Sequence, residues 1–300
     1  MFFHVDIKGD GLPPKTLCLT YDDGPGATAG DGPGPRTDEL GAYLHSRGIA
    51  ATFFVIGRHA AAHRDILDRL RDRRHLIGNH TDSHPGLVSL AASGGDVVGE
   101  IARTDEIITP YAEIGVRFLR APYGNWRETE AADGAPRDRP ISIVARALNR
   151  SGRFRDHVGP INWDISGEDY DFWKEGRPAE DCARRYLERI RPVGRGIILM
   201  HDSSEDAGLR AGNRALEVTK LIVPALEAEG YRFIRLDAIP QVQTAMAVTS
   251  LVALRTGEDR YLGWSDEPRG RIVAEARSVG AREQFGVVEL DADRIALRAG

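Results

Sequence analysis

The sequence predicts an α/β fold in which βα units form a parallel sheet closed as a barrel, followed by a small all-β segment. Two observations predict it. From about residue 15 to residue 236, seven short apolar runs alternate with amphipathic helical patterns, which is typical of βα units. After about Pro240, short β-like runs separated by Gly, Pro and Asp follow one another without a helical pattern between them. We therefore expect a barrel over residues 1–240 and a small β module over residues 241–300.

The elements of the barrel are expected to alternate in order along the chain. Short apolar runs bounded by polar loops predict strands at residues 17–21, 52–56, 75–78, 116–119, 159–163, 196–200 and 231–236. Apolar positions spaced three and four residues apart predict helices at residues 37–46, 60–71, 96–111, 141–149, 179–190 and 214–229. In the β module, strands are expected at residues 251–255, 260–264, 271–277, 284–290 and 294–298.

Composition and charge exclude several classes of protein. The 40 Lys and Arg residues against 45 Asp and Glu residues give a net charge of −5, and 41% hydrophobic with 28% charged residues is typical of a folded globular chain. No run of Lys and Arg is interleaved with aromatic residues, so no nucleic-acid partner is expected. No stretch approaches the roughly 20 apolar residues that a membrane-spanning helix needs, so no membrane span is expected.

The first residues and the cysteines bear on the compartment. Residues 1–6 meet the acidic Asp6 too early to form the apolar core of a signal peptide. We therefore expect the chain as given to be cytoplasmic, or extracytoplasmic if a leader has been removed. The two cysteines, Cys18 and Cys182, are too few for a disulfide framework.

Polar clusters follow five of the expected strands. The active sites of barrels are built from the loops at the carboxyl ends of the strands, so these clusters are expected to meet at one mouth. They are Asp22-Asp23-Gly24-Pro25, the segment from His80 to His84, the segment from Arg120 to Gly124, Trp163-Asp164 with Asp169 close behind, and the segment from Leu199 to His201.

Two of the clusters together indicate a metal site. His80 and His84 are four residues apart, and one helical turn would place both rings on the same side, as a zinc site requires. Alone, such a pair is more often two solvated histidines. Asp22 and Asp23 at a strand end point to different sides, so that one carboxylate can bind a metal while the other faces a water molecule. Alone, this pair is more often part of a turn, but the two clusters together favour the metal site.

Arg120 and His201 each have two interpretations. Arg120 could be a surface residue before a tight turn, or its guanidinium could hold a carboxylate and keep it ionised. His201 could be a hydrogen-bonded residue at the end of a core strand. Opposite a metal it becomes a candidate general acid, because histidine titrates near neutral pH.

The ordered motifs resemble those of the polysaccharide deacetylases of carbohydrate esterase family four, over about residues 15–240. The motifs that carry the resemblance are Thr20-Tyr21-Asp22-Asp23-Gly24-Pro25, His80-x-x-Ser83-His84, Arg120-x-Pro122-Tyr123-Gly124 and Leu199-x-His201. The resemblance implies a distorted (β/α)7 barrel that holds one divalent metal, usually Zn²⁺, with Co²⁺ or Ni²⁺ as alternatives.

The resemblance also implies a role for each matching residue. The implied metal ligands are Asp23, His80 and His84, with Asp22 as general base, Arg120 as its tether and His201 as the acid that protonates the departing amine. The backbone at Tyr123 is implied to stabilise the oxyanion, and Tyr123, Trp163 and Leu199 are the implied substrate-contacting positions.

The sequence departs from the family pattern in two places. Ser166 stands where the first aspartate of the family's fourth motif is expected, so that either Asp164 or Asp169 must hold His201. Tyr170 replaces the Trp at the end of that motif, a change that an aromatic wall should tolerate. Residues 26–35 lengthen the loop after the first motif; this insertion either shapes substrate access or is a tolerated surface loop.

The implied activity is the hydrolysis of acetyl groups from N-acetylated sugars in chitin-like or peptidoglycan-like chains, so an acetylated oligo- or polysaccharide is the expected partner. The alternatives are an O-deacetylase of the acetylxylan type, a hydrolase of a small amide, and a catalytically weak carbohydrate-binding protein. The last is motivated by Ser166 and by the β module, whose residues 252–257 resemble part of one repeat of a fascin-type β-trefoil and are restated at residues 295–300. A trefoil needs three such repeats.

Overall fold

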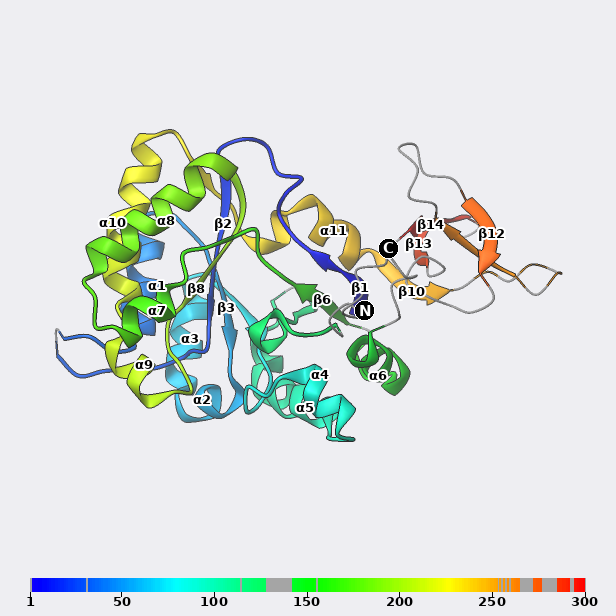
Figure 1. Ribbon diagram of the computed structural model, residues 1–300, viewed down its shortest axis with the longest axis horizontal. Helices are drawn as coiled ribbons and strands as arrows, with labels where there is room; N and C mark the ends of the chain where they lie inside the picture. The colour runs from blue at the N-terminus through cyan, green and yellow to red at the C-terminus, as the bar shows by residue number, and fades with distance from the viewer. Residues whose placement is uncertain are drawn as a thin grey trace.

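The computed structural model describes residues 2–30, 32–113, 115–127, 142–154, 156–252, 254, 256, 258, 260–264, 272–276, 285–291 and 294–299. Its larger part is a parallel-stranded α/β barrel, and the strands β10 to β14 lie to one side of this barrel, beyond α11 (Figure 1).

The main sheet of the barrel is centred on β2 (Thr16–Asp22). Its strand order is β4-β3-β2-β8-β7, and every pair in it is parallel. The short strand β9 also pairs with the first residues of β2. The other strands of this sheet are β3 (Thr52–Val55), β4 (Leu76–Asn79), β7 (Ile165–Ser166), β8 (Arg195–His201) and β9 (Arg232–Phe233).

A second parallel sheet continues the wall of the barrel in the order β1-β6-β5. It consists of β1 (Phe2–Ile7), β6 (His157–Ile161) and β5 (Arg117–Phe118). A single parallel bridge between Asn79 and Leu119 connects it to β4. Because one bridge replaces a full ladder there, the barrel is distorted, and the predicted fold class is confirmed. Strand β1 was not expected, because its partner β6 is about 150 residues away and no local pattern records that pairing.

Helices cover the outside of both sheets (Figure 1). They are α1 (Thr37–Ser46), α2 (Gly57–Ala62), α3 (Arg64–Asp72), α4 (Leu87–Ala92), α5 (Val97–Ile108), α6 (Ile143–Ser151), α7 (Asp169–Lys174), α8 (Ala179–Val193), α9 (Ala207–Gly212), α10 (Ala215–Ala228) and α11 (Pro240–Met246). The helix predicted over residues 37–46 is confirmed. The one predicted over 60–71 is divided into α2 and α3, because His63 has the non-helical backbone angles φ −132° and ψ 45°. The short helices α4, α7, α9 and α11 were not expected.

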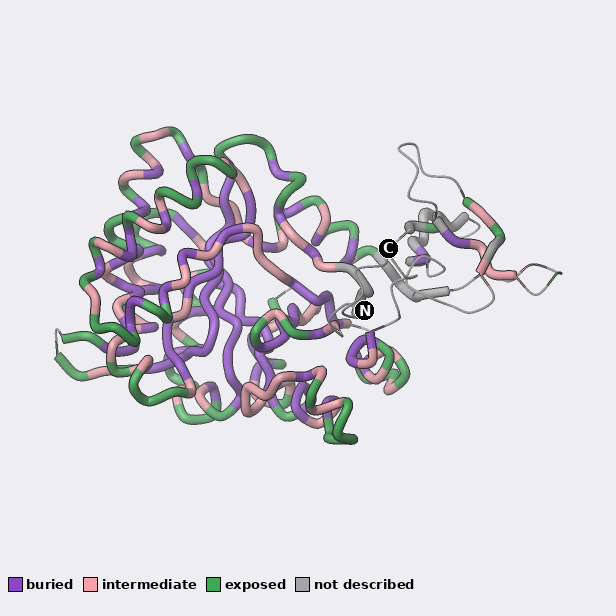
Figure 2. The backbone as a smooth tube through the Cα atoms, in the orientation of Figure 1, coloured by how far each residue is buried: buried purple, intermediate pink, exposed green. Residues whose placement is uncertain are grey.

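Alternation along β2 divides the core into two layers. Leu17, Leu19 and Tyr21 pack outward with the helices, whereas Cys18 packs inside the barrel with Phe54 and Ile197. Figure 2 shows the strands as the buried centre of the molecule. By the same alternation, Thr20 and Asp22 share the inner face of β2 with Cys18. The carboxylate of Asp22, at the carboxyl end of the strand, therefore lies inside the barrel. Cys18 and Cys182 are both buried and free.

The C-terminal strands form two small antiparallel sheets. One has the order β10-β13-β14, and the other pairs β11 with β12. The strands are β10 (Val248–Val252), β11 (Tyr261–Trp264), β12 (Ile272–Ala276), β13 (Phe285–Asp291) and β14 (Arg294–Ala299). Parts of the segment that resembles a trefoil repeat lie outside the described residues, so that the trefoil stays a prediction.

Helix α11 packs on the barrel although it follows the expected boundary at residue 240. Its Val242 and Ala245 are buried in the inner cluster with Ile7, Leu12 and Leu236. We therefore propose that the β module begins after Ala247.

Candidate active site

Parallel pairing in register brings the predicted clusters to one end of the barrel. Asp22, the last residue of β2, pairs with His201, the last residue of β8. Asn79 ends β4 and forms the bridge to Leu119, so that His80 and Arg120 follow two adjoining strand ends. The site is therefore assembled from residues that are far apart in sequence but occupy equivalent positions on neighbouring strands.

Asp23, His80 and His84 form a cluster that could hold a metal ion, with their ligand atoms all within 4.8 Å of one another. The Oδ1 atom of Asp23 lies 3.4 Å from Nε2 of His80 and 3.2 Å from Nε2 of His84. Within the described residues, this buried oxygen has no hydrogen-bond partner. Nδ1 of His80 donates to the carbonyl oxygen of Arg120 at 2.9 Å, which leaves the lone pair of Nε2 facing the cluster. A carboxylate and two imidazoles arranged in this way fit a divalent metal.

The two histidines do not meet through the expected helical turn. Thr81 and His84 have positive φ angles of 70° and 57°, and Oγ1 of Thr81 accepts the backbone N–H of His84 at 3.1 Å. Asp23 is also left-handed, with φ 74°. Such conformations cost free energy in non-glycine residues and are concentrated at functional sites. The loop geometry, rather than helical periodicity, brings the three ligand atoms together.

Arg120 is a buried tether for Asp22, not a surface residue. Its Nη1 atom donates to Oδ1 of Asp22 at 2.7 Å and to Oγ1 of Thr20 at 2.8 Å. Its remaining donors reach the carbonyl oxygens of Ile161 and Asn162 at 3.1 Å and 3.2 Å. The guanidinium also lies over the ring of Phe54, 4.2 Å from the ring centroid. These contacts fix the position of the Asp22 carboxylate at the end of β2.

Of the two carboxylates expected to hold His201, the structure brings Asp169 to the imidazole. Oδ1 of Asp169 lies 2.7 Å from Nδ1 of His201, and its Oδ2 accepts the backbone N–H of His201 at 2.8 Å. Burial alone would lower the pKa of His201, but the Asp169 carboxylate outweighs burial and raises it to about 10.

The expectation that Asp164 could hold His201 is wrong. Oδ2 of Asp164 instead accepts the backbone N–H groups of Gly9 and Ile197 at 2.8 Å and 2.7 Å. The physical reason is the turn between β7 and α7. Oγ of Ser166 accepts the N–H of Glu168 at 3.1 Å, Glu168 has a φ of 57°, and the next residue, Asp169, begins α7 pointing back at β8.

The residues that the resemblance implies to contact the substrate differ in how far they are exposed. Tyr123 is 71% exposed, has a φ of 60°, and its ring centroid lies 4.6 Å from that of His84. Trp163 is partly buried, and a Cβ atom on Gly124 would lie 2.8 Å from its ring, so that glycine permits this close approach. Leu199 is buried on β8, and Tyr170 faces His201 edge-on at 5.9 Å.

Asp202 is a buried carboxylate near the cluster that the sequence analysis did not single out. It is buried beside the cluster, and Oγ1 of Thr37 donates to its Oδ2 atom. A Cβ atom on Gly24 would overlap this carboxylate, so that the glycine of the first motif leaves room for it. Burial raises the pKa of Asp202 to about 7, although the hydrogen bond from Thr37 lowers it. Its only sequence signal is its position directly after His201.

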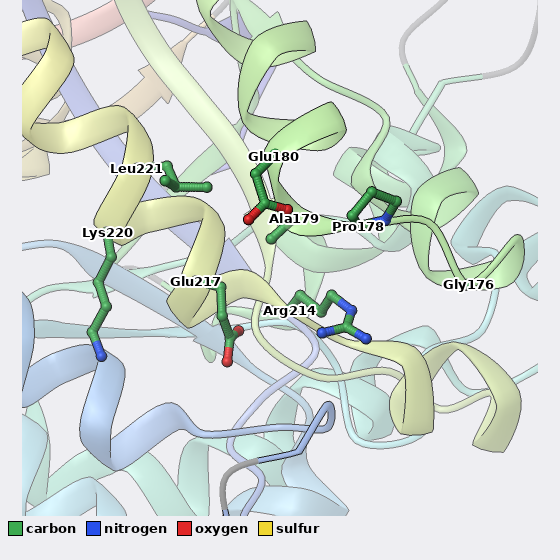
Figure 3. A pocket seen from close by; sticks show the side chains of 8 residues that line it. All are labelled: Gly176, Pro178, Ala179, Glu180, Arg214, Glu217, Lys220 and Leu221. Atoms are coloured by element: carbon green, nitrogen blue, oxygen red, sulfur yellow. The ribbon is translucent and has the colours of Figure 1, made fainter.

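Two pockets lie outside the ligand cluster. One, of about 600 Å³, is lined by residues 26–28 and 33–35 of the inserted loop and by Pro25, together with His59, Ser203 and Arg210. The insertion therefore lines a cavity that His59 shares. The other, of about 420 Å³, lies on the outer helices and is lined by Glu180 of α8 and by Glu217 and Lys220 of α10 (Figure 3). It contains none of the predicted site residues. Within the described residues, no helix is both long and apolar enough to cross a membrane.

Together, the fold and the Asp-His-His cluster define an α/β barrel with a candidate divalent-metal site. Residues 9–134 match the family model described as polysaccharide deacetylase. A chitooligosaccharide deacetylase of Rhizobium leguminosarum bv. trifolii is 29% identical over 247 residues, which cover 79% of this chain and 96% of that protein. A peptidoglycan-N-acetylglucosamine deacetylase of Bacillus cereus is 26% identical over 225 residues, which cover 75% of this chain and 68% of that protein.

Solved structures show the same fold. The crystal structure of a peptidoglycan N-acetylglucosamine deacetylase superposes with a TM-score of 0.56 at 23% identity, and the match covers 75% of this chain and 88% of that one. Residues 9–134 thus match the polysaccharide deacetylase family, and the resemblance predicted from the motifs is confirmed.

Proposed function

We propose that this protein is a metal-dependent deacetylase that hydrolyses the acetamide of N-acetylglucosamine units in chitin-like or peptidoglycan-like chains. The observation that carries the proposal is the cluster of Asp23, His80 and His84 at the carboxyl end of the barrel, flanked by the carboxylate of Asp22 and the imidazole of His201. The names of the similar proteins, which act on chitooligosaccharides or on peptidoglycan N-acetylglucosamine, support this class of substrate.

Asp23, His80 and His84 are the proposed ligands of one divalent ion, for which Zn²⁺ is our first choice and Co²⁺ or Ni²⁺ the alternatives. Such an ion supplies two effects when bound: it lowers the pKa of water and it polarises the acetyl carbonyl. These residues fit such an ion for two reasons. Oδ1 of Asp23 has no hydrogen-bond partner, and Nε2 of His80 is not the nitrogen that donates to the backbone.

Asp22 is the proposed general base. Arg120 occupies its Oδ1 atom, and its Oδ2 atom lies 3.6 Å from Nε2 of His80, on the side of the ligand cluster. The carboxylate is therefore held with one oxygen tethered and the other facing the position where water would attack. The ion pair with Arg120 also fixes the orientation of the carboxylate, as a base that must reach one particular proton requires.

His201 is the proposed general acid. Asp169 holds its Nδ1 atom, which leaves Nε2 as the ring nitrogen available to transfer a proton. An imidazolium can give its Nε2 proton to the amine nitrogen as the carbon–nitrogen bond breaks. Asp169 thus takes the role that Ser166 cannot fill, and this weakens the argument for a catalytically weak binding protein.

The remaining roles concern the acetyl group and the sugar. The backbone N–H of Tyr123 is the proposed donor to the oxyanion, which needs a donor fixed in place before the reaction. The left-handed backbone of Tyr123 sets the direction of that N–H and leaves the side chain exposed beside His84. Trp163 and Leu199 are also proposed to contact the substrate.

The test measures acetate release from chitooligosaccharides and from acetylated xylan, each with and without a chelator. The expected result is chelator-sensitive release from the chitooligosaccharides, restored by added Zn²⁺. Release from acetylated xylan alone would replace the N-deacetylase proposal with an O-deacetylase. Binding of either sugar without any acetate release, in protein shown to contain metal, would replace it with a carbohydrate-binding protein.

A further inference from the structure

We infer that His59 is a positioning residue for the metal ligand Asp23, and that Glu205 in turn orients the ring of His59. This inference rests on the proposed function, because it assigns to these two residues a task at the same metal site. Neither residue belongs to a motif by which the sequence resembles the family.

The contact of His59 with Asp23 is direct. Nδ1 of His59, on α2, lies 2.7 Å from the backbone carbonyl oxygen of Asp23. A carbonyl oxygen can only accept, so that Nδ1 carries the hydrogen and donates it. The side chain of His59 is 19% exposed, so this hydrogen bond is largely shielded from water.

Asp23 needs such a restraint because its backbone is in a costly conformation. Its φ angle is 74°, a region that a non-glycine residue occupies only when its surroundings enforce it. Its N–H donates to the carbonyl oxygen of Phe54 at 3.2 Å, and its carbonyl oxygen accepts from His59. The two bonds hold the peptide groups on either side of the Cα atom, and the direction of the metal-binding carboxylate follows from them.

Helix α2 also holds the loop that carries the histidine ligands. The N–H of Gly57 donates to the carbonyl oxygen of Thr81 at 2.9 Å, and the N–H of Arg58 donates to that of Asp82 at 3.2 Å. A Cβ atom on Gly57 would lie 2.7 Å from Oδ1 of Asp82, so that the loop can approach this closely only at a glycine. The start of α2 thus binds both ligand segments, through its backbone on one side and through His59 on the other.

Glu205 lies on the far side of the His59 ring. Its Oε1 atom is 3.4 Å from Nε2 of His59. Within the described residues, this buried oxygen has no hydrogen-bond partner. Glu205 follows His201 by four residues, so that the chain Asp23–His59–Glu205 connects the metal cluster with the loop after β8. Partners of this kind behind a metal ligand set its orientation, and their loss typically weakens metal binding by about 10–100-fold.

The experiment measures the Zn²⁺ dissociation constant of metal-free protein by competition with a chromophoric chelator. The variants are His59→Ala, His59→Asn, His59→Gln and Glu205→Gln. An asparagine amide nitrogen occupies about the position of histidine Nδ1, whereas a glutamine amide nitrogen occupies about that of Nε2. His63→Ala is the matched control, because His63 follows on the same segment and lines the same pocket. The melting temperature of each metal-free variant reports folding.

We expect His59→Ala to weaken Zn²⁺ binding by about 10–100-fold and Glu205→Gln to weaken it by a smaller factor. His59→Asn should bind more tightly than His59→Gln, and His63→Ala should bind like the wild type. Unchanged affinity in His59→Ala overturns the inference. If His59→Ala does not fold, equal affinities of the Asn and Gln variants overturn it, because a role in packing alone does not depend on the position of the donor. Wild-type protein that binds none of Zn²⁺, Co²⁺ and Ni²⁺ overturns the proposed function instead.

Discussion

Two charge pairs flank the ligand cluster, and their construction is opposite. On one side a carboxylate, Asp22, faces the cluster and a buried cation, Arg120, holds it. On the other side an imidazole, His201, faces the cluster and a buried carboxylate, Asp169, holds it. Arg120 and Asp169 are both 0% exposed. Each proposed catalytic group is thus held by a fully buried group of the opposite charge.

Arg120 and Asp169 differ in the number of chain segments that they contact. Arg120 also contacts β2 and the backbone at the end of β6, and its guanidinium lies over Phe54. Both oxygens of Asp169 contact His201 alone among the hydrogen bonds found in the described residues. The proposed base, Asp22, is therefore fixed by a network of contacts, whereas the proposed acid, His201, depends on a single carboxylate. We expect that changes on the acid side alter the pH dependence more readily than they alter the structure.

The largest effect on activity is expected from the loss of a proposed metal ligand, because both charge pairs flank the ligand cluster. His84→Ala removes one of three proposed ligands, so that most bound metal and nearly all activity should be lost. Metal analysis of purified protein is the measurement. Full retention of metal would sink the ligand assignment.

Asp22→Asn should have the next largest effect. The amide cannot take a proton, so that activity should fall by about 10²-fold or more, while metal content and fold are kept. Steady-state kinetics with metal analysis is the measurement. Near-normal turnover in this variant would exclude Asp22 as the base.

Asp169→Asn should reduce activity less, by roughly tenfold at neutral pH, below the usual range for a fully lost acid. Asp169 raises the pKa of His201 to about 10, so that its loss should move the basic limb of the pH–rate profile to lower pH.

The same raised pKa of His201 stabilises the fold. From its ordinary value of 6.5, that contribution is fully present below about pH 6.5 and is lost as the pH rises to about 10.

The corresponding measurements are a pH–rate profile and denaturant unfolding at several pH values. The stability difference between wild type and Asp169→Asn should therefore be larger at pH 6 than at pH 10. A basic limb that does not move would mean that another group protonates the amine.

Asp164→Ala sharpens the contrast between the two candidate carboxylates. It leaves the N–H groups of Gly9 and Ile197 without their acceptor, so that the free energy of unfolding should fall by about 1–3 kcal/mol. Activity should stay within about twofold of wild type, because Asp164 does not reach His201. Denaturant unfolding and kinetics are the measurements. A shifted pH–rate profile in this variant would contradict its purely structural role.

Truncation after Ala247 should have the smallest effect. The hydrogen bonds of Thr256, Glu258 and Leu262 join residues of the C-terminal segment to one another. The cut keeps α11, whose Val242 is buried in the barrel, so that the rate on a short chitooligosaccharide should stay within a few-fold. Loss of that activity in a folded barrel would mean that the β module reaches the site. Weaker turnover of insoluble polymer would agree with a role in holding it.

The amino-acid sequence by itself determined the order of the elements and the residue types at the strand ends. The helix Thr37–Ser46 and the clusters around Asp22, His80, Arg120 and His201 could be predicted because their signals are local. Apolar periodicity predicts the helices and strands. The residue types that follow each strand indicate which chemistry is possible there. Since parallel strands have their carboxyl ends on one side, convergence of the clusters follows from the fold class.

Only the tertiary structure decided which of these residues meet and in what geometry. Asp164 and Asp169 are equally good candidates in the sequence, but the left-handed turn at Glu168 directs only Asp169 to His201. The pairing of β1 with β6 and the contact of His59 with Asp23 were also beyond prediction. The physical reason is the same in each case. Such contacts depend on strand register and on backbone conformations that the surrounding packing enforces, and neither leaves a periodic pattern in the chain.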